Sequence, residues 1–225
     1  MRRLVLLLLL IGSLLQAQRT PSVRATGEGV VAAMPELVRI NLTISTPANT
    51  AQEATDQNAT TSLAVSNRVK ALIGTSGEIR TVSYSVIPNY RTTPPLNIQT
   101  LIGFTANNTL EVTAYDLNLA GKIVDAAVQA GATSISGLRF GLKDSDPQRR
   151  DALKRATQAA RANATAIAEG LSVRLGSILA AAEGSSASVF NPTDARAGIA
   201  ATATTFDTGL VEVRATVTLE IAIIQ

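Results

Sequence analysis

The side chains available for chemistry in this sequence are hydroxyls, amines, guanidinium groups, phenols and carboxylates, because its 225 residues include neither histidine nor cysteine. Thiolate and imidazole nucleophiles, histidine general bases, disulfides and zinc centres are therefore excluded. What remains for an enzyme is chemistry by Ser or Thr hydroxyls, Tyr, Lys and carboxylates. The motifs Gly-x-x-x-x-Gly-Lys and Ser-x-x-Lys do not occur, so a phosphate-binding loop and a serine–lysine dyad are absent at those spacings.

One glycine motif invites a nucleotide-binding interpretation. Residues 27–32, Gly-Glu-Gly-Val-Val-Ala, match the spacing Gly-x-Gly-x-x-Ala. A dinucleotide fingerprint must follow a strand and open a helix, whereas here Pro35 and an alternating apolar pattern follow. We therefore interpret Gly27 and Gly29 as part of a bent first strand, and we expect no cofactor.

Two further groups of side chains could hold a ligand or a proton. Asp144 and Asp146 could bind calcium, but Pro147 follows them without further spaced acids, which favours helix capping. The three tyrosines could act as acids, yet strand-face packing is the favoured interpretation for Tyr84, Tyr90 and Tyr115. The sequence thus predicts no catalytic, cofactor-binding or metal-binding residue.

The elements that must position these side chains follow from the period of the apolar residues. Alternation with a period of two predicts strands, and recurrence at three and four predicts helices. The predicted strands cover 22–33, 36–46, 78–88, 101–115, 133–143 and 172–183, and a last strand begins at Gly209. The predicted helices cover 49–73, from Asp116 or Asn118 to Gly131, and from Asp146 to Glu169 or Gly170.

Several local features refine these predictions. In the last helix the core stripe is expected to be Leu153, Ala156, Ala160, Ala164, Ile167 and Leu171. In the second helix Ile123, Val124, Ala127 and Val128 are expected to face inward. A phase shift at Gly137 predicts a β-bulge, and the strands flanking a proline-rich loop at 91–100 are expected to pair as a hairpin. Residues 184–208 show no period and are interpreted as a long loop.

The interspersed helices and half-polar strands predict an α+β fold with antiparallel or mixed sheets and about three α-helices. The C-terminal strand alternates most clearly, with Val211, Val213, Ala215 and Val217 opposing polar neighbours. A hydrophobic fraction of 46% is typical of a globular protein.

The N-terminus has the pattern of a secretory signal peptide. Arg2 and Arg3 precede an unbroken apolar run from Leu4 to Ile11, and small residues lead to Ala17. We therefore expect residues 1–17 to be removed and 18–225 to form one domain, with two halves at about 22–116 and 117–225 as an open alternative. Loss of the two arginines changes the net charge from +3 to +1. Without basic clusters, a nucleic-acid partner is not expected, and no later apolar run is long enough for a transmembrane helix.

The ordered motifs of the chain resemble the SIMPL domain family, a family of unknown function. The segments that carry the resemblance span nearly the whole predicted mature chain: Thr26-Gly27-Glu28-Gly29, 79–85 before Pro88 and Tyr90, 103–108, Asp116-Leu117, 121–127 before Ala130-Gly131-Ala132, 149–168 and 209–213. The resemblance is to exported bacterial members, which are periplasmic or outer-membrane-associated immunogenic proteins or are linked to oxidative-stress defence. It implies ring-like oligomers and carries over no catalytic residue.

Two function classes remain. The favoured hypothesis is a non-enzymatic, exported cell-envelope protein that acts by self-assembly or by binding an envelope partner, with a role in stress defence suggested by the resemblance. Its aromatic loop residues Phe190 and Phe206 could insert into a neighbouring copy or fold back onto their own domain. The alternative is a periplasmic hydrolase or carbohydrate-processing enzyme, in which two carboxylates would face one cleft.

Overall fold

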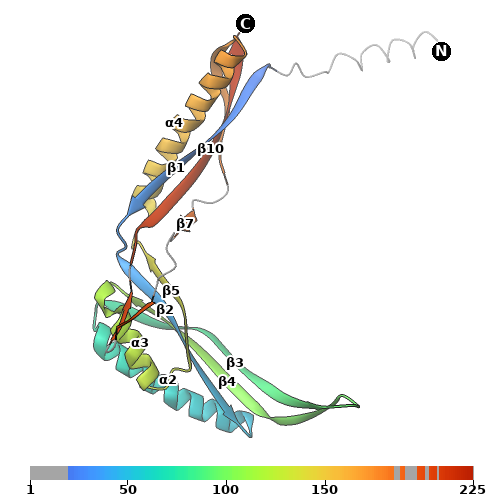
Figure 1. Cartoon of the computed structure of the whole chain (residues 1–225), viewed down its shortest axis with the longest axis vertical. Helices are drawn as coiled ribbons and strands as arrows, with labels where there is room; N and C mark the ends of the chain where they lie inside the picture. Colours follow the sequence, from blue (N-terminus) through green and yellow to red (C-terminus); the bar gives the residue numbers. More distant parts are fainter. Residues whose placement is uncertain (1–19, 185–187, 191–196, 201–202, 207, 225) are drawn as a thin grey trace, which may run out of the picture. The chain divides into compact units, whose positions relative to one another are not determined.

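The computed structural model describes residues 20–184, 188–190, 197–200, 203–206 and 208–224. It has an α+β fold, and the strand pairings with an assigned register are all antiparallel, as predicted (Figure 1). The chain forms two compact units, which are the described parts of 1–30, 150–187 and 214–225, and the described parts of 31–149 and 188–213. Each unit is assembled from segments far apart in the sequence, unlike the two contiguous halves considered above.

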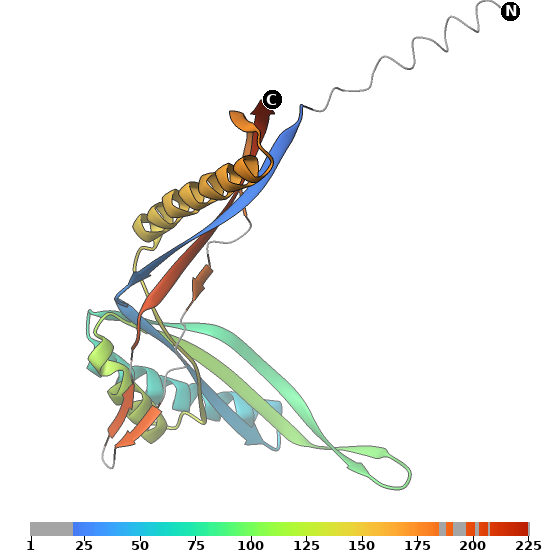
Figure 2. The same ribbon diagram turned by 45° about the horizontal axis from the view of Figure 1, so that its top comes forward.

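The second unit is a four-stranded sheet covered on one face by helices. Its strands are β2 (Leu37–Ala48), β3 (Gly77–Thr93), β4 (Ile98–Ala114) and β5 (Ser134–Gly141), in the order β3-β4-β2-β5. Helices α2 (Ala51–Ile73) and α3 (Ala120–Gln129) lie on the same face (Figures 1 and 2). The core between the layers is built from the even-numbered residues of β2, such as Ile40 and Leu42, together with Val65, Val69 and Ile123.

Local sequence explains where α2 begins and ends. Thr50 accepts a hydrogen bond from the Glu53 amide, and the Glu53 carboxylate accepts one from the Thr50 amide, which forms a capping box. The helix ends before Gly74, whose positive φ of 54° suits glycine. The predicted helix and its end at Gly74 are confirmed, as is the strand that precedes it.

A buried polar side chain joins α2 to the sheet. Asn58 is fully buried, and its Nδ2 donates to the carbonyl oxygens of Ile44 and Ala106 at 2.9 and 3.0 Å and to Thr46 Oγ1 at 3.2 Å. Ser62 Oγ donates to Asn58 Oδ1 at 3.3 Å. These bonds hold the helix at one position above β2 and β4, because a buried amide without its partners is costly.

The hairpin of β3 and β4 is longer than the sequence analysis predicted. Pairing continues to Thr93 and Ile98, so the turn is Pro94–Asn97 and not the whole of 91–100. The predicted pairing of the two strands is confirmed. The prolines lie in the turn itself, where their missing N–H groups remove no ladder hydrogen bond.

Of two other predictions for this unit, one needs correction and one is confirmed. A short 3₁₀ helix, η1 (Leu117–Leu119), capped by Asp116, precedes α3, and Val128 is 54% exposed instead of facing inward. The predicted bulge in β5 is confirmed, because the register against β2 shifts between Arg39 and Asn41 and Gly137 has a φ of 60°.

In the first unit, α4 (Asp146–Gly170) packs along a sheet in the order β1-β10-β6. These strands are β1 (Ser22–Ala33), β10 (Val211–Ile224) and β6 (Arg174–Glu183). The strand β7 (Ser188–Phe190) also pairs with β10. The predicted α4 stripe is confirmed at Ala156, Ala160 and Ala164. It is wrong at its larger residues, because the stripe is completed by Ala152 and Ala168. Ile167 and Leu171 are instead exposed, because β1 approaches too closely for large side chains.

The segment 184–208 contains short strands as well as loop. β8 (Ala197–Ala200) and β9 (Ala203–Phe206) pair as a hairpin, which corrects the prediction of an irregular loop. Phe206 packs against the core of the second unit, so it folds back onto its own chain. The Phe190 side chain lies outside the described residues, as does the predicted signal peptide. None of the described helices is both long and apolar enough to span a bilayer.

Candidate functional site

The face of the second unit's sheet opposite the helices carries ordered rows of polar side chains. One row runs across all four strands through Glu78, Thr113, Arg39 and Arg139, which are partners in register. The next row comprises Arg80, Glu111, Asn41 and Ser136. Directly opposed residues of neighbouring strands project to the same face, so the charged groups of β2, β3, β4 and β5 gather on one surface. We call this surface the open face.

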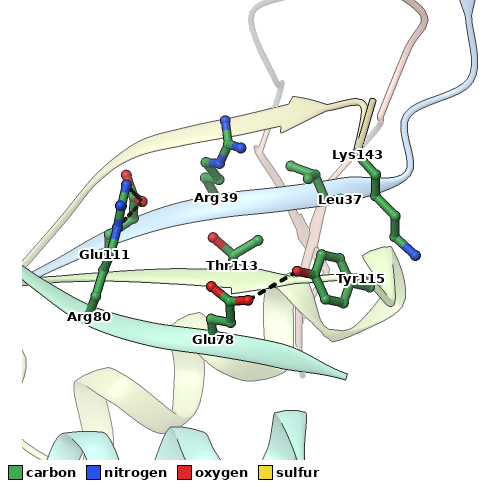
Figure 3. A pocket seen from close by; sticks show the side chains of 8 residues that line it. All are labelled: Leu37, Arg39, Glu78, Arg80, Glu111, Thr113, Tyr115 and Lys143. Carbon is green, nitrogen blue, oxygen red and sulfur yellow. Dashed lines mark hydrogen bonds and ion pairs between the residues drawn. The ribbon is translucent and has the colours of Figure 1, made fainter. Parts of the chain in front are cut away.

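A hollow of about 270 Å³ lies on the open face, lined by Leu37, Arg39, Glu78, Arg80, Glu111, Thr113, Tyr115 and Lys143. In it, Arg80 donates from Nε and Nη2 to the same carboxylate oxygen of Glu111, at 2.9 and 2.7 Å. The Glu111 side chain is only 18% exposed. Figure 3 shows these two side chains side by side at one end of the hollow.

The other end of the hollow is organised around Tyr115, which follows β4. Its hydroxyl donates to Glu78 Oε1 at 3.5 Å, a long hydrogen bond, and Lys143 Nζ lies 4.6 Å from the centre of its ring (Figure 3). A cation above an aromatic ring is attracted to the ring's negative face. The hollow therefore contains two carboxylates, Glu78 and Glu111, and each already accepts a hydrogen bond from a neighbour.

This arrangement bears directly on carboxylate catalysis. A glycosidase-like mechanism needs one protonated acid and one carboxylate that reaches the substrate or a water molecule. Here Oε1 of Glu111 accepts two hydrogen bonds from Arg80, which hold the carboxylate in place. The geometry fits binding of a polar or charged group better than proton transfer.

The candidates from the sequence lie elsewhere and are not brought together. Gly27 and Gly29 lie inside β1 against the backbone of α4, where a close approach of two elements requires them. Asp144 Oδ1 accepts a hydrogen bond from the Asp146 amide at 2.9 Å. Asp146 itself lies in the first turn of α4, so of the two acids it is Asp144 whose side chain accepts from the start of the helix. Among the described residues, no group of three or more acidic side chains could hold a metal ion.

Tyr84 and Tyr90 lie in β3, which agrees with the predicted position on a strand. Tyr84 and Tyr90 are about half exposed, at 50% and 54%. Tyr115 is the one that contributes to the hollow.

The alternation around Val38 and Ile40 was sufficient to place Arg39 on a polar face, but only strand pairing aligns it with Arg139.

A second exposed feature is the end of the β3–β4 hairpin. β2 pairs with β4 only as far as Phe104, so residues 89–103, which we call the arm, form a two-stranded ribbon beyond the sheet (Figures 1 and 2). The arm carries a single charged residue, Arg91. Its large apolar side chains are about half exposed or more: Tyr90, Leu96, Ile98, Leu101 and Ile102.

Comparison with known proteins now gives the family. A family model described as SIMPL, protein of unknown function (DUF541), matches residues 23–221. The chain belongs to the SIMPL family. The resemblance inferred from the ordered motifs is thereby confirmed.

Two relatives outline what is known of similar proteins. This SIMPL chain is 27% identical over 164 residues to the 26 kDa periplasmic immunogenic proteins of Brucella melitensis and Brucella abortus. The match covers 72% of this chain and 66% of each relative, so the SIMPL chain spans about two thirds of their length. Their names describe location and immunogenicity and no enzymatic activity.

Proposed function

We propose that this protein is a non-enzymatic component of the bacterial periplasm that self-assembles through its β3–β4 arm. The observation that carries this proposal is the arm's exposed apolar surface. Tyr90 and Leu101, directly paired across the two strands, are 54% and 48% exposed. Exposed apolar patches of folded proteins usually mark interaction surfaces.

The arm has little to stabilise it in isolation. A two-stranded ribbon is marginally stable in water unless another element covers it. Apolar residues occur on both sides of the arm, since Ile98 and Leu101, three positions apart in a regularly paired stretch of β4, are both about half exposed and alternate side chains of a strand point in opposite directions. Contact with a partner would cover one or both of these faces.

A second copy of the chain is the occupant that the arm fits. The arm carries a single charge, Arg91, and the predicted mature chain has a net charge of +1. Electrostatic repulsion between two copies is therefore small. The same low charge makes attraction to anionic lipid weak. Closed, symmetric assemblies are the usual form of homo-oligomers, so we expect a ring or an assembly of dimers.

The proposal of a non-enzymatic role is supported by the state of the carboxylates. Glu78 and Glu111, which share the hollow on the open face, are each hydrogen-bonded to a neighbouring side chain. A periplasmic location is supported by the N-terminal signal pattern and by the names of the two relatives. Intact-mass measurement on an envelope fraction is expected to give a chain starting at Gln18; full-length protein in the cytosol would contradict export.

Light scattering coupled to size exclusion tests the assembly. The mature protein is expected to elute as an oligomer at micromolar concentration, and the double variant Tyr90→Ser/Leu101→Ser as a monomer. Leu63→Ser is the matched control, because Leu63 is 62% exposed on α2 and outside the arm. A monomeric parent protein, or an oligomer unaffected by the double variant, would refute assembly through the arm. If Leu63→Ser abolishes the oligomer as completely as the double variant does, a specific role of the arm in assembly is refuted.

A further inference from the structure

Two arginines on the open face oppose each other directly. Arg39 of β2 and Arg139 of β5 are partners in register, and both side chains are exposed. Like charges at directly opposed positions destabilise a sheet, since their Cβ atoms lie only about 5 Å apart. Within the described ranges neither guanidinium group takes part in an ion pair or side-chain hydrogen bond.

The neighbouring acids do not neutralise this pair. Glu111 is held by Arg80, and Figure 3 shows the Arg39 side chain apart from that ion pair. Glu78 lies two strands away in the same row, beyond Thr113, and is bonded to Tyr115. Glu36 is the acid near Lys143, where its Oε2 accepts the backbone amide at 2.9 Å.

A second hollow adjoins the arginine pair. It has a volume of about 390 Å³ and is lined by Arg39, Arg139, Lys143, Ser145 and the intervening segment 140–142. It shares Arg39 and Lys143 with the hollow described above. Its three charged lining side chains are all cationic, and its volume lies within the range of small-ligand sites.

From this juxtaposition we propose that Arg39 and Arg139 form the centre of an oxyanion-binding site for a small ligand carrying a phosphate or carboxylate group. Guanidinium groups present paired donors that match both kinds of group. Lys143 adds a third positive charge, and the Ser145 hydroxyl adds a neutral donor. The bound anion relieves the repulsion between the arginines, so binding and local stability are coupled. This site does not depend on self-assembly through the arm.

Inorganic phosphate is the first probe, measured by isothermal titration and by thermal unfolding of the mature protein at constant ionic strength with chloride as reference. Phosphate is expected to raise the melting temperature above that in chloride, because a ligand that binds only the folded state stabilises it. Arg39→Gln and Arg139→Gln are each expected to weaken phosphate binding at least tenfold, by removing charge-assisted hydrogen bonds. Titration with glucose 6-phosphate and with glucuronate then shows whether the site binds a phosphate group or a carboxylate group more tightly.

The control is Arg68→Gln, which removes the same charge from the exposed side of α2, on the opposite face of the sheet. It is expected to bind phosphate like the parent. In phosphate-free buffer Arg139→Gln is expected to melt at the parent temperature or above it, which separates lost binding from misfolding. The site is refuted if phosphate acts no differently from chloride, or if Arg68→Gln weakens binding as much as the two open-face variants. A lower melting temperature of Arg139→Gln without phosphate would refute the proposed repulsion.

Discussion

Gly29 in β1 lies directly against the backbone of Ala152 in α4, so closely that a methyl group on Gly29 would collide with the Ala152 carbonyl oxygen. Gly27 has the same relationship to Ala156 and Ala160. The helix and the strand are thus in contact through glycine on one side and alanine on the other. This explains both the glycine motif near the N-terminus and the alanine stripe 120 residues later in the chain without any nucleotide.

Gly29→Ala is therefore expected to lower the free energy of unfolding by about 2 kcal/mol, since overpacking of a filled interface forces the backbone apart. Urea denaturation monitored by circular dichroism measures the change. The matched control is Gly170→Ala at the end of α4, where an added methyl group meets nothing within 4 Å. Equal destabilisation by the two variants would contradict the close packing.

A buried residue of α4 and an exposed residue just after the helix should differ in how strongly a change of side-chain size affects stability. Ala164 is fully buried and Leu171, just after the helix, is 60% exposed. Ala164→Leu is expected to cost about 1–3 kcal/mol, whereas Leu171→Ala should change stability by about 0.5 kcal/mol or less. If thermal unfolding gives the reverse order, Leu171 is buried as the sequence predicted and is not an exposed residue.

Asn58→Asp is expected to destabilise the second unit by at least about 2 kcal/mol, because it replaces the donor that serves the Ile44 and Ala106 carbonyl oxygens with an acceptor. The control is Asn67→Asp, the same substitution at an exposed position of the same helix. Chemical denaturation of both variants provides the comparison, and a similar loss in the two would indicate an effect of helix charge and not of the buried amide.

The C-terminal strand should distinguish its two faces sharply. Val213→Asp places a charge at a position that is 1% exposed, one of the most destabilising kinds of substitution, while Thr216→Lys on the half-buried side should change stability by about 0.5 kcal/mol or less. Differential scanning calorimetry measures the melting temperatures of both variants. Equal shifts in melting temperature would mean that both faces of β10 are buried.

Features that depend on neighbouring residues could be predicted well. The alternation is confirmed from Val211 to Ile221 by the burial of β10, whereas Ile223 is only partly buried. The end of α2 at Gly74 follows from a helix-ending signal within a few residues. The alanines at the centre of the α4 stripe were predicted correctly. Ile167 and Leu171 were predicted wrongly because hydrophobicity favoured them, while the close approach of β1 to α4 requires small side chains. The turn at Pro94–Asn97 was overestimated for a similar reason: β3 and β4 continue to pair beyond the strand lengths that the sequence pattern indicated.

The sequence alone determined the absence of histidine and cysteine chemistry, the α+β class and the polar side of β2 that carries Arg39, because composition and side-chain periodicity are local properties. Tertiary structure decided which distant residues meet. Arg39 and Arg139 are 100 positions apart, and their opposition depends on the register between β2 and β5, which the bulge at Gly137 shifts. A displacement of one residue would send Arg139 to the helix-covered face, since successive side chains of a strand point in opposite directions.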